Sequence, residues 1–224
     1  MIVIMAGGIG SGKTLSVVKD IVDRQQRTFT NFSLWGKPYT RLKYDHMFDK
    51  VSDGKKTTLK LNYKYWNKEA KKQGGFDIYL DEFHNLMSSR RAMSKRNVLL
   101  SDWLSQIRKI LGQSELNNLV LVTQKCRRID VNSRDLAHYA IMCNKVQYDN
   151  VLIPTEVREK GKLITKQLPL TMIYKNFFAD AESLMNYESY SIGGPITRTR
   201  FVGNPYYKYF DSYELIDFGS EEYV

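Results

Sequence analysis

Gly7-Gly8-Ile9-Gly10-Ser11-Gly12-Lys13-Thr14 decides the fold, because it matches the pattern G-x-x-x-x-G-K-[ST] of a phosphate-binding loop. The wholly apolar run of residues 1–5 before it is typical of a buried strand. The residues after it are apolar at helical spacing: Leu15, Val18, Ile21 and Val22. Strand, glycine loop and helix therefore follow in the order that this motif requires.

The residue types of the loop suit a nucleoside triphosphate. Glycines let the backbone turn its N–H groups toward a phosphate, and the following helix directs its positive end at the same anion. Lys13 is expected to reach the β- and γ-phosphates, and the Thr14 hydroxyl to hold Mg²⁺. We therefore expect ATP and Mg²⁺ as cofactors. The predicted nucleotide contacts are Gly8, Ile9, Gly10, Ser11, Gly12, Lys13, Thr14 and Leu15.

A second motif, FDIYLDE at residues 76–82, is rich in strand-forming residues and ends in two acids, as a Walker B strand does. Asp81 is expected to hold Mg²⁺ through water or through Thr14, and Glu82 to polarise the water that attacks the γ-phosphate. A catalytic glutamate favours a hydrolase over a kinase. The alternative, in which Glu82 caps a helix or lies on the surface, stays open.

Residues 116–124 predict a further buried strand that ends in Thr123 and Gln124. In one large division of phosphate-loop ATPases, an additional strand lies between the two Walker strands and carries a polar sensor at its tip. Gln124 fits that place and could bond the γ-phosphate or the attacking water. The alternative is a strand end that turns polar as it leaves the core. The predicted fold class is α/β, a P-loop NTPase with a mainly parallel central sheet flanked by helices.

Arginines near this strand are candidates for an arginine finger, which gives positive charge to the ATP of an adjacent subunit. We expect Arg134 in this role, with Arg90, Arg91 and Arg128 as alternatives. A salt bridge of Arg134 within its own domain is an equal alternative. His84 is interpreted as a packed or surface residue.

The composition describes a folded, basic protein. The chain has 224 residues, 42% of them hydrophobic, and a formal net charge of +10. Such a charge favours a polyanionic partner, nucleic acid first and a membrane surface second, although a merely soluble basic protein remains an alternative. Cys126 and Cys143 suggest neither a disulfide scaffold nor a zinc site. No apolar run is long enough to cross a bilayer, so we expect a soluble protein that is not secreted.

A basic stripe accompanies a predicted helix over residues 59–70, where Leu59, Tyr63, Trp66 and Ala70 repeat at helical spacing. The candidate nucleic-acid contacts on its neighbouring face are Lys60, Lys64, Lys68 and Lys72. A solvated lysine face is the equal alternative. A second amphipathic helix is predicted to end at Gly112.

The C-terminal part, residues 146–224, predicts a β-hairpin that turns at Lys160-Gly161, a strand over 170–178, a helix over 179–187 and a tyrosine-rich tail. Before it, residues 140–143 predict a short strand. The tail could stack on nucleic acid, but packing over its own core or a neighbouring subunit is favoured. We expect a single domain over 1–224, with a core at 1–145.

The order of these motifs over residues 1–145 resembles the HerA/FtsK-type P-loop ATPases of viruses and mobile elements. That group includes genome-packaging ATPases and the zonula-occludens-toxin-like morphogenesis proteins of filamentous phages. The resemblance implies a ring with nucleotides between subunits, double-stranded DNA as a partner, and a viral capsid or vertex protein as a further one.

The toxin-like branch often carries a membrane anchor, and the lack of one here favours a DNA-stimulated packaging motor, in the host cytoplasm or associated with the virion. A phage-extrusion or conjugation-type ATPase is the alternative, and a nucleoside or nucleotide kinase is a third.

Overall fold

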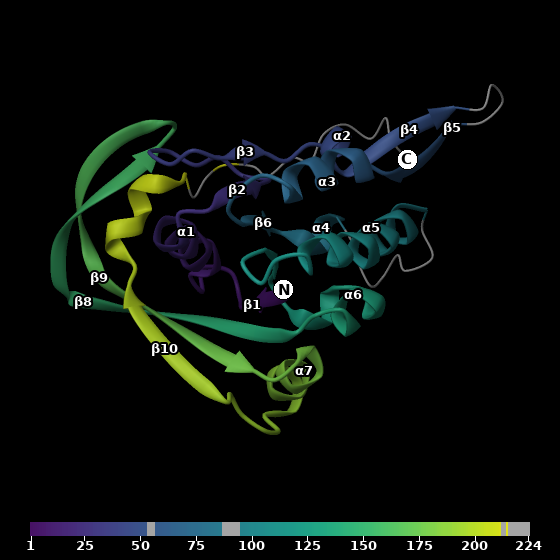
Figure 1. The fold of residues 1–224 in the computed structure, drawn as a ribbon. Coiled ribbons are helices and arrows are strands. Elements are labelled where there is room, and N and C mark those ends of the chain that lie inside the picture. The colour runs from purple at the N-terminus through teal and green to yellow at the C-terminus, as the bar shows by residue number, and fades with distance from the viewer. Residues whose placement is uncertain (53–56, 87–94, 212–213, 215–224) are drawn as a thin grey trace.

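The computed structural model describes residues 1–224 except 53–56, 87–94, 212–213 and 215–224 (Figure 1). Its centre is an eight-stranded sheet in the order β10-β9-β8-β1-β7-β6-β2-β3. The parallel strands are β1 (Ile2–Ala6), β2 (Arg27–Thr30), β3 (Thr40–Arg41), β6 (Phe76–Leu80), β7 (Asn118–Thr123) and β8 (Tyr139–Glu159). Two antiparallel strands, β9 (Lys162–Phe178) and β10 (Thr197–Val202), complete one edge.

The predicted additional strand is confirmed. β7 lies between β1, which leads into the phosphate loop, and β6, which carries the two acids. In the register, Ile4 pairs with Leu121 and Leu119 pairs with Ile78. Because these strands are parallel, their carboxyl ends meet at one edge of the sheet, where ligands of such folds bind.

Alternate residues of β1 enter two separate cores, one on each face of the sheet. Val3 and Met5 pack with the apolar side of α1 (Lys13–Arg24). Ile2 and Ile4 pack in the core of the other face. That core contains residues of α3 (Tyr63–Ala70), α5 (Lys95–Leu111) and α7 (Ala181–Tyr190). A strand buried on both faces is therefore apolar throughout, as residues 1–5 predicted.

The prediction of a helix over residues 59–70 is wrong at the N-terminal end of that range. Residues 57–61 form β5 (Thr57–Leu61), which pairs with β4 (Phe48–Ser52) and places Lys60 opposite Asp49. The helix begins only at Tyr63, because the Asn62 side chain accepts a hydrogen bond from the backbone N–H of Tyr65, 3.0 Å away. Lys60 therefore does not share a helix face with Lys64.

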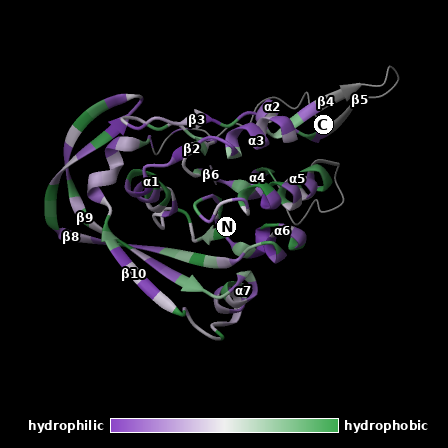
Figure 2. Ribbon diagram, in the orientation of Figure 1, coloured by the Kyte–Doolittle hydropathy of each residue, from purple (hydrophilic) through white to green (hydrophobic). Residues whose placement is uncertain are grey.

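The hairpin turn at Lys160-Gly161 is confirmed, with φ angles of 48° and 78° that suit a two-residue turn. Its arms are longer than predicted. β8 joins the strand expected over 140–143 to the first arm, and β9 joins the second arm to the strand expected over 170–178. Both strands carry hydrophobic and hydrophilic segments in turn (Figure 2).

β10 was not predicted from the sequence, because its residues TRTRFV are mostly polar. The remaining short elements are α2 (Tyr44–Met47), α4 (Phe83–Leu86), α6 (Val131–Asp135) and the 3₁₀ helices η2 (Cys126–Arg128) and η3 (Asn204–Tyr209).

Candidate nucleotide-binding site

The phosphate loop connects β1 to α1 through a left-handed glycine. Gly12 has φ 87° and forms the N-cap of α1 with no side-chain hydrogen bond. The first N–H groups of a helix lack intrahelical partners, so this end is available to an anion. A Cβ at Gly12 would also collide with Cδ1 of Ile173, on β9. The backbone conformation therefore favours glycine here, and a Cβ would also force the Ile173 side chain to move.

Two side chains of the loop fit a bound phosphate. Lys13 is 6% exposed, and its Nζ donates to the Gly8 carbonyl at 3.0 Å, so the ammonium lies over the loop. The Ser11 Oγ is buried and has no hydrogen-bond partner among the described residues. A buried hydroxyl without a partner is costly, and a phosphate oxygen would satisfy it.

The Thr14 hydroxyl donates to Asp81 Oδ2 at 2.7 Å, across 67 positions in sequence. Asp81 is 4% exposed and follows the last residue of β6. A hydroxyl and a carboxylate oxygen are hard ligands that suit Mg²⁺. In the described part of the chain, no three His, Cys, Asp or Glu side chains form a metal cluster, so the nucleotide and water would supply the remaining ligands.

Asn31, which follows β2, holds Asp81 in place and was missed by the sequence analysis. Its Nδ2 donates to the Asp81 carbonyl and its Oδ1 accepts from the Asp81 N–H, both at 2.8 Å. Asn31 is fully buried. From the sequence, Asn31 was only one polar residue inside a run of strand-forming residues over 27–34.

Glu82 has a left-handed backbone with φ 50°, a conformation that is uncommon for residues other than glycine. Its N–H donates to Asp81 Oδ1 at 2.8 Å. Burial, together with the neighbouring Asp81 charge, raises the pKa of the Glu82 carboxyl above its ordinary value. This turn brings Glu82 to the same cavity as the phosphate loop.

Two side chains lie against the Glu82 carboxylate, Gln124 from the residue after β7 and His84 from α4, and Arg128 contacts both of them. Oε2 of Glu82 lies 3.5 Å from Gln124 Nε2 and 3.3 Å from His84 Nε2. Arg128 Nη1 donates to Gln124 Oε1 at 2.6 Å and lies 3.5 Å from His84 Nε2. Burial and the Arg128 and Lys13 charges lower the pKa of His84. His84, interpreted from sequence as a packed or surface residue, is thus a neighbour of Glu82.

A cavity of about 540 Å³ joins these groups. Its phosphate-loop side consists of Ile9, Gly10, Gly12, Lys13, Thr14 and Leu15. The Walker B and sensor side consists of Asp81, Glu82, Asn85 and Gln124. The structure therefore brings together the residues that the three sequence motifs predicted to meet.

The C-terminal segment and β8 supply most of the remaining lining, which was not predicted from the sequence. Its members are Lys145, Tyr207, Phe210, Asp211 and Glu214, together with Phe32. Glu214 is fixed by Ser33, whose N–H and Oγ both donate at 2.8 Å. The Lys145 side chain forms no ion pair or hydrogen bond with any described residue. Tyr206, Tyr207, Tyr209 and Phe210 of the tail pack over the chain's own core, as favoured from the sequence, whereas Tyr190 is exposed.

The predicted arginines lie in different places. Arg134, on α6, directs Nη1 at the sulfur of Met185 on α7, and it is absent from the described lining of the cavity. Arg128 contacts Gln124 in its own chain. Arg90 and Arg91 lie outside the described residues. The role of each as a finger stays a prediction.

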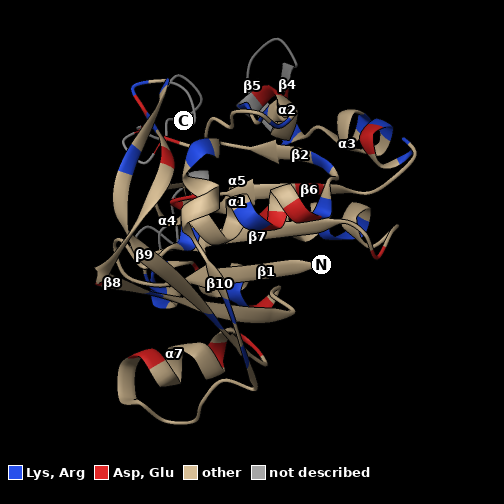
Figure 3. Ribbon diagram, turned by 90° about the vertical axis from the view of Figure 1, so that its left-hand side faces the viewer, with Lys and Arg blue, Asp and Glu red and all other residues tan. Residues whose placement is uncertain are grey.

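The candidate nucleic-acid lysines are all exposed: Lys60 on β5, Lys64 and Lys68 on α3, and Lys72 after it. Figure 3 shows basic residues on α3. Lys72 pairs with Glu69 at 2.6 Å. Their role in binding DNA stays a prediction.

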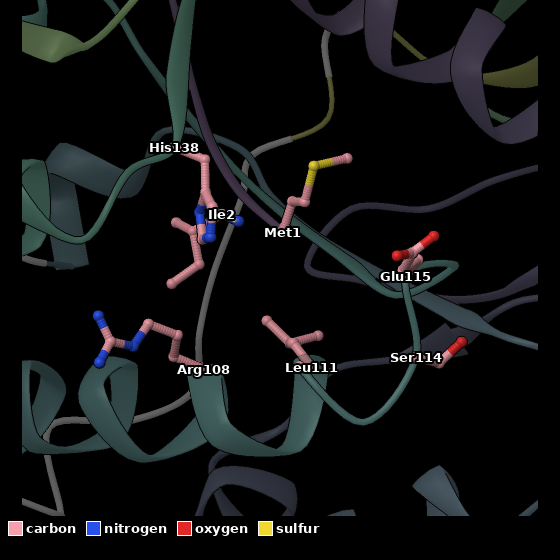
Figure 4. Close-up of a pocket in the computed structure, with 8 residues that line it drawn as sticks. Met1, Ile2, Arg108, Leu111, Ser114, Glu115 and His138 are labelled. Carbon is pink, nitrogen blue, oxygen red and sulfur yellow. Dashed lines mark hydrogen bonds between the residues drawn. The ribbon is translucent and has the colours of Figure 1, made fainter.

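A second cavity of about 310 Å³ lies at the other end of β1, away from the loop (Figure 4). Met1, Arg108, Leu111 and His138 are among its lining residues, and the Ile2 N–H donates to His138 Nδ1 at 3.1 Å. It contains no group of the phosphate loop, so the first cavity is the candidate nucleotide site.

The fold and this site define a phosphate-loop NTPase with an additional strand between its two Walker strands. The chain belongs to the zonular occludens toxin (Zot) family, whose model matches residues 1–155. The resemblance inferred from the order of motifs is thereby confirmed. No curated protein matches the sequence.

Solved structures with a similar fold include the N-terminal domain of zonular occludens toxin from Neisseria meningitidis. It is 16% identical, with a TM-score of 0.46, over 90% of this chain and 92% of that one. Another is the genome packaging NTPase B204 from Sulfolobus turreted icosahedral virus 2 in complex with ATP-gammaS, at 14% identity and a TM-score of 0.41. That alignment covers 92% of this chain and 97% of the other. Within the described residues, no helix has the length and apolarity needed to cross a membrane.

Proposed function

We propose that the protein hydrolyses ATP with Mg²⁺. The observation that carries this proposal is the 2.7 Å contact between the Thr14 hydroxyl and Asp81, beside Lys13 and Glu82 in one cavity. Lys13 and the N–H groups at the start of α1 hold the β- and γ-phosphates. Thr14 and Asp81 hold Mg²⁺, which neutralises charge on the phosphates when bound.

Glu82 orients the attacking water and accepts a proton from it. Gln124, 3.5 Å from Glu82, lies where it can bond the same water or the γ-phosphate. These two side chains also favour a hydrolase over a nucleoside or nucleotide kinase, because a kinase must exclude water from the phosphate that it transfers.

Release of inorganic phosphate from ATP tests the proposal. We expect turnover that needs Mg²⁺, is lost in Lys13→Ala, and is lost in Glu82→Gln while ATP binding remains. Transfer of phosphate to an added nucleoside, with none released to water, would instead identify a kinase.

We further propose that hydrolysis moves DNA and that the working form is a ring. The net charge of +10 and the exposed lysines of α3 support a polyanionic partner. Genome packaging into a capsid is one form of this function. Phage assembly or extrusion, as in the zonula-occludens-toxin-like morphogenesis proteins that the order of motifs resembles, is the alternative.

Two measurements separate these forms. The rate of ATP hydrolysis is measured with double-stranded DNA, with single-stranded DNA and without DNA, while the mass of the assembly is recorded. Stimulation by duplex DNA in an assembled ring supports packaging. Hydrolysis that depends on a membrane partner, with co-fractionation in membranes, supports extrusion. An assembled ring that no nucleic acid stimulates contradicts a DNA motor.

A further inference from the structure

Arg128 lies at the end of a series of contacts that leads to the catalytic carboxylate. It belongs to η2, the 3₁₀ helix that follows β7, and its side chain is exposed. Its Nη1 donates to Gln124 Oε1 at 2.6 Å. Gln124 Nε2 in turn faces Glu82 Oε2 at 3.5 Å.

The chemistry of these groups fixes the orientation of the Gln124 amide. A guanidinium has only donors, so it must meet the amide oxygen. The amide NH₂ group then points at Glu82, whose ionised carboxylate has only acceptors. If the amide were rotated by half a turn, its oxygen would face the carboxylate and its NH₂ group the guanidinium. Both contacts would then be repulsive, and Arg128 prevents this arrangement.

His84 adds a second contact to the same arrangement. Its Nε2 lies 3.3 Å from Glu82 Oε2 and 3.5 Å from Arg128 Nη1. Arg128 thus touches both side chains that surround Glu82. It is not among the described residues that line the nucleotide cavity.

We propose that Arg128 acts within its own subunit as a positioning residue, which holds Gln124 so that its amide NH₂ faces Glu82. This inference rests on the proposed ATP hydrolysis. If Arg128 has this role, it is no longer a candidate for the arginine finger that acts on the ATP of a neighbouring subunit. The expected effect is on turnover rather than on nucleotide binding, because Arg128 reaches the phosphates only through Gln124 and Glu82.

A double-mutant cycle tests this with kcat and KM for ATP, using Arg128→Ala, Gln124→Ala and the double variant. We expect Arg128→Ala to lower kcat about 10-fold at unchanged KM, the size of one lost charged hydrogen bond. Adding Arg128→Ala to Gln124→Ala should then cost nothing more. If the two losses multiply, Arg128 acts on its own and the inference is wrong.

Two further variants provide a conservative replacement and a control for the double-mutant cycle. Arg128→Lys keeps one donor for Gln124 Oε1 and should recover most of kcat. Arg127→Ala, the exposed neighbour on the same 3₁₀ helix, is the matched control and should leave kcat unchanged. An equal loss of kcat in Arg127→Ala would mean that the substitutions act by disturbing the 3₁₀ helix and not through Gln124.

Mixing distinguishes action within one subunit from action between subunits. Chains with Glu82→Gln and chains with Arg128→Ala are combined in one assembly. An arginine that acted on the neighbour would restore activity where an intact Glu82 meets an intact Arg128. We expect no restoration beyond the sum of the two variants, and a clear gain would overturn the proposal.

A readout without hydrolysis keeps the inference separable from the proposed function. The side-chain amide resonances of ¹⁵N-labelled Gln124 are followed by NMR without nucleotide. Glu82→Ala should shift them in the otherwise unchanged protein but not in the Arg128→Ala background. Equal shifts in both backgrounds would contradict positioning by Arg128, whether or not the protein hydrolyses ATP. Absence of phosphate release alone would contradict only the proposed function.

Discussion

Asn31 and Asp81, 50 positions apart, form a reciprocal pair in which one side chain serves both backbone groups of the other residue. The Asn31 amide donates to the Asp81 carbonyl and accepts from its N–H, each at 2.8 Å. This pair continues the pairing of β2 with β6 beyond the last paired residues, Thr30 and Tyr79. The pair therefore fixes the position at which Asp81 and Glu82 follow the end of β6.

Replacing Asn31 by Ala should therefore impair both stability and catalysis. The Asp81 backbone would lose two buried partners, at about 1–3 kcal/mol for each unsatisfied group. We expect a lower free energy of unfolding in urea and a higher Mg²⁺ concentration for half-maximal ATP hydrolysis.

The matched control for that substitution is Asn176→Ala, which removes a buried amide that donates to the Met142 carbonyl at 3.3 Å. It should destabilise the protein without changing the Mg²⁺ requirement. An equal change in Mg²⁺ requirement in both variants would mean that Asn31 has no particular role at Asp81.

Thr14→Ala should separate metal use from nucleotide binding. It removes the hydroxyl that contacts Asp81 while leaving Lys13 and the loop backbone in place. We expect kcat to fall about 10²-fold or more, with weaker binding of ATP in the presence of Mg²⁺. Binding measured in EDTA should change little, and the conservative variant Thr14→Ser should keep most of the activity.

Lys145→Ala should weaken the binding of ATP. Lys145 lines the nucleotide cavity from β8 and has no ion-pair partner among the described residues, so its charge is available to the phosphates. We expect Kd for ATP to rise about 10-fold, the effect of one charged hydrogen bond. Lys162→Ala, at an exposed position of β9, provides the control and should leave Kd unchanged. Equal affinities of the wild type and Lys145→Ala would exclude Lys145 from the site.

Cys126 should resist alkylation in the folded protein. It is fully buried, and burial together with the Glu188 charge raises the pKa of its thiol to about 12. Only the thiolate reacts, so at pH 8 about one thiol in 10⁴ is reactive even where reagent can enter. Iodoacetamide labelling followed by mass spectrometry should modify Cys126 only after denaturation. Rapid labelling of the native protein would show that this region opens.

The local motifs were predictable from sequence because each is contained within a few residues. Gly12, Lys13 and Thr14 specify the loop, and the apolar runs specify β1, β6 and β7. The order of the central strands followed from the family pattern. The Lys160-Gly161 turn was recognisable because glycine accepts a left-handed backbone.

The residues that sequence reasoning missed depend on tertiary contacts. Asn31 acts through Asp81, and Lys145 reaches the cavity only because β8 lies next to β1. Leu59 and Lys60 continued a helical spacing that Asn62 interrupts by capping the helix. Within β10, alternating threonine and arginine give no apolar face, so the sequence carries no pattern that predicts a strand there.

Because Ile173 lies close to Gly12, the chain cannot be truncated before β9 without changing the surroundings of the phosphate loop. The phosphate loop looks self-contained in sequence, yet the side chain under its last glycine comes from the far arm of the C-terminal hairpin. A fragment that stopped at residue 145 would keep every nucleotide-binding motif and lose the surface on which the loop rests. The far arm of the hairpin therefore contributes to the packing of the candidate nucleotide site, and a displacement of Ile173 would alter the surroundings of Gly12.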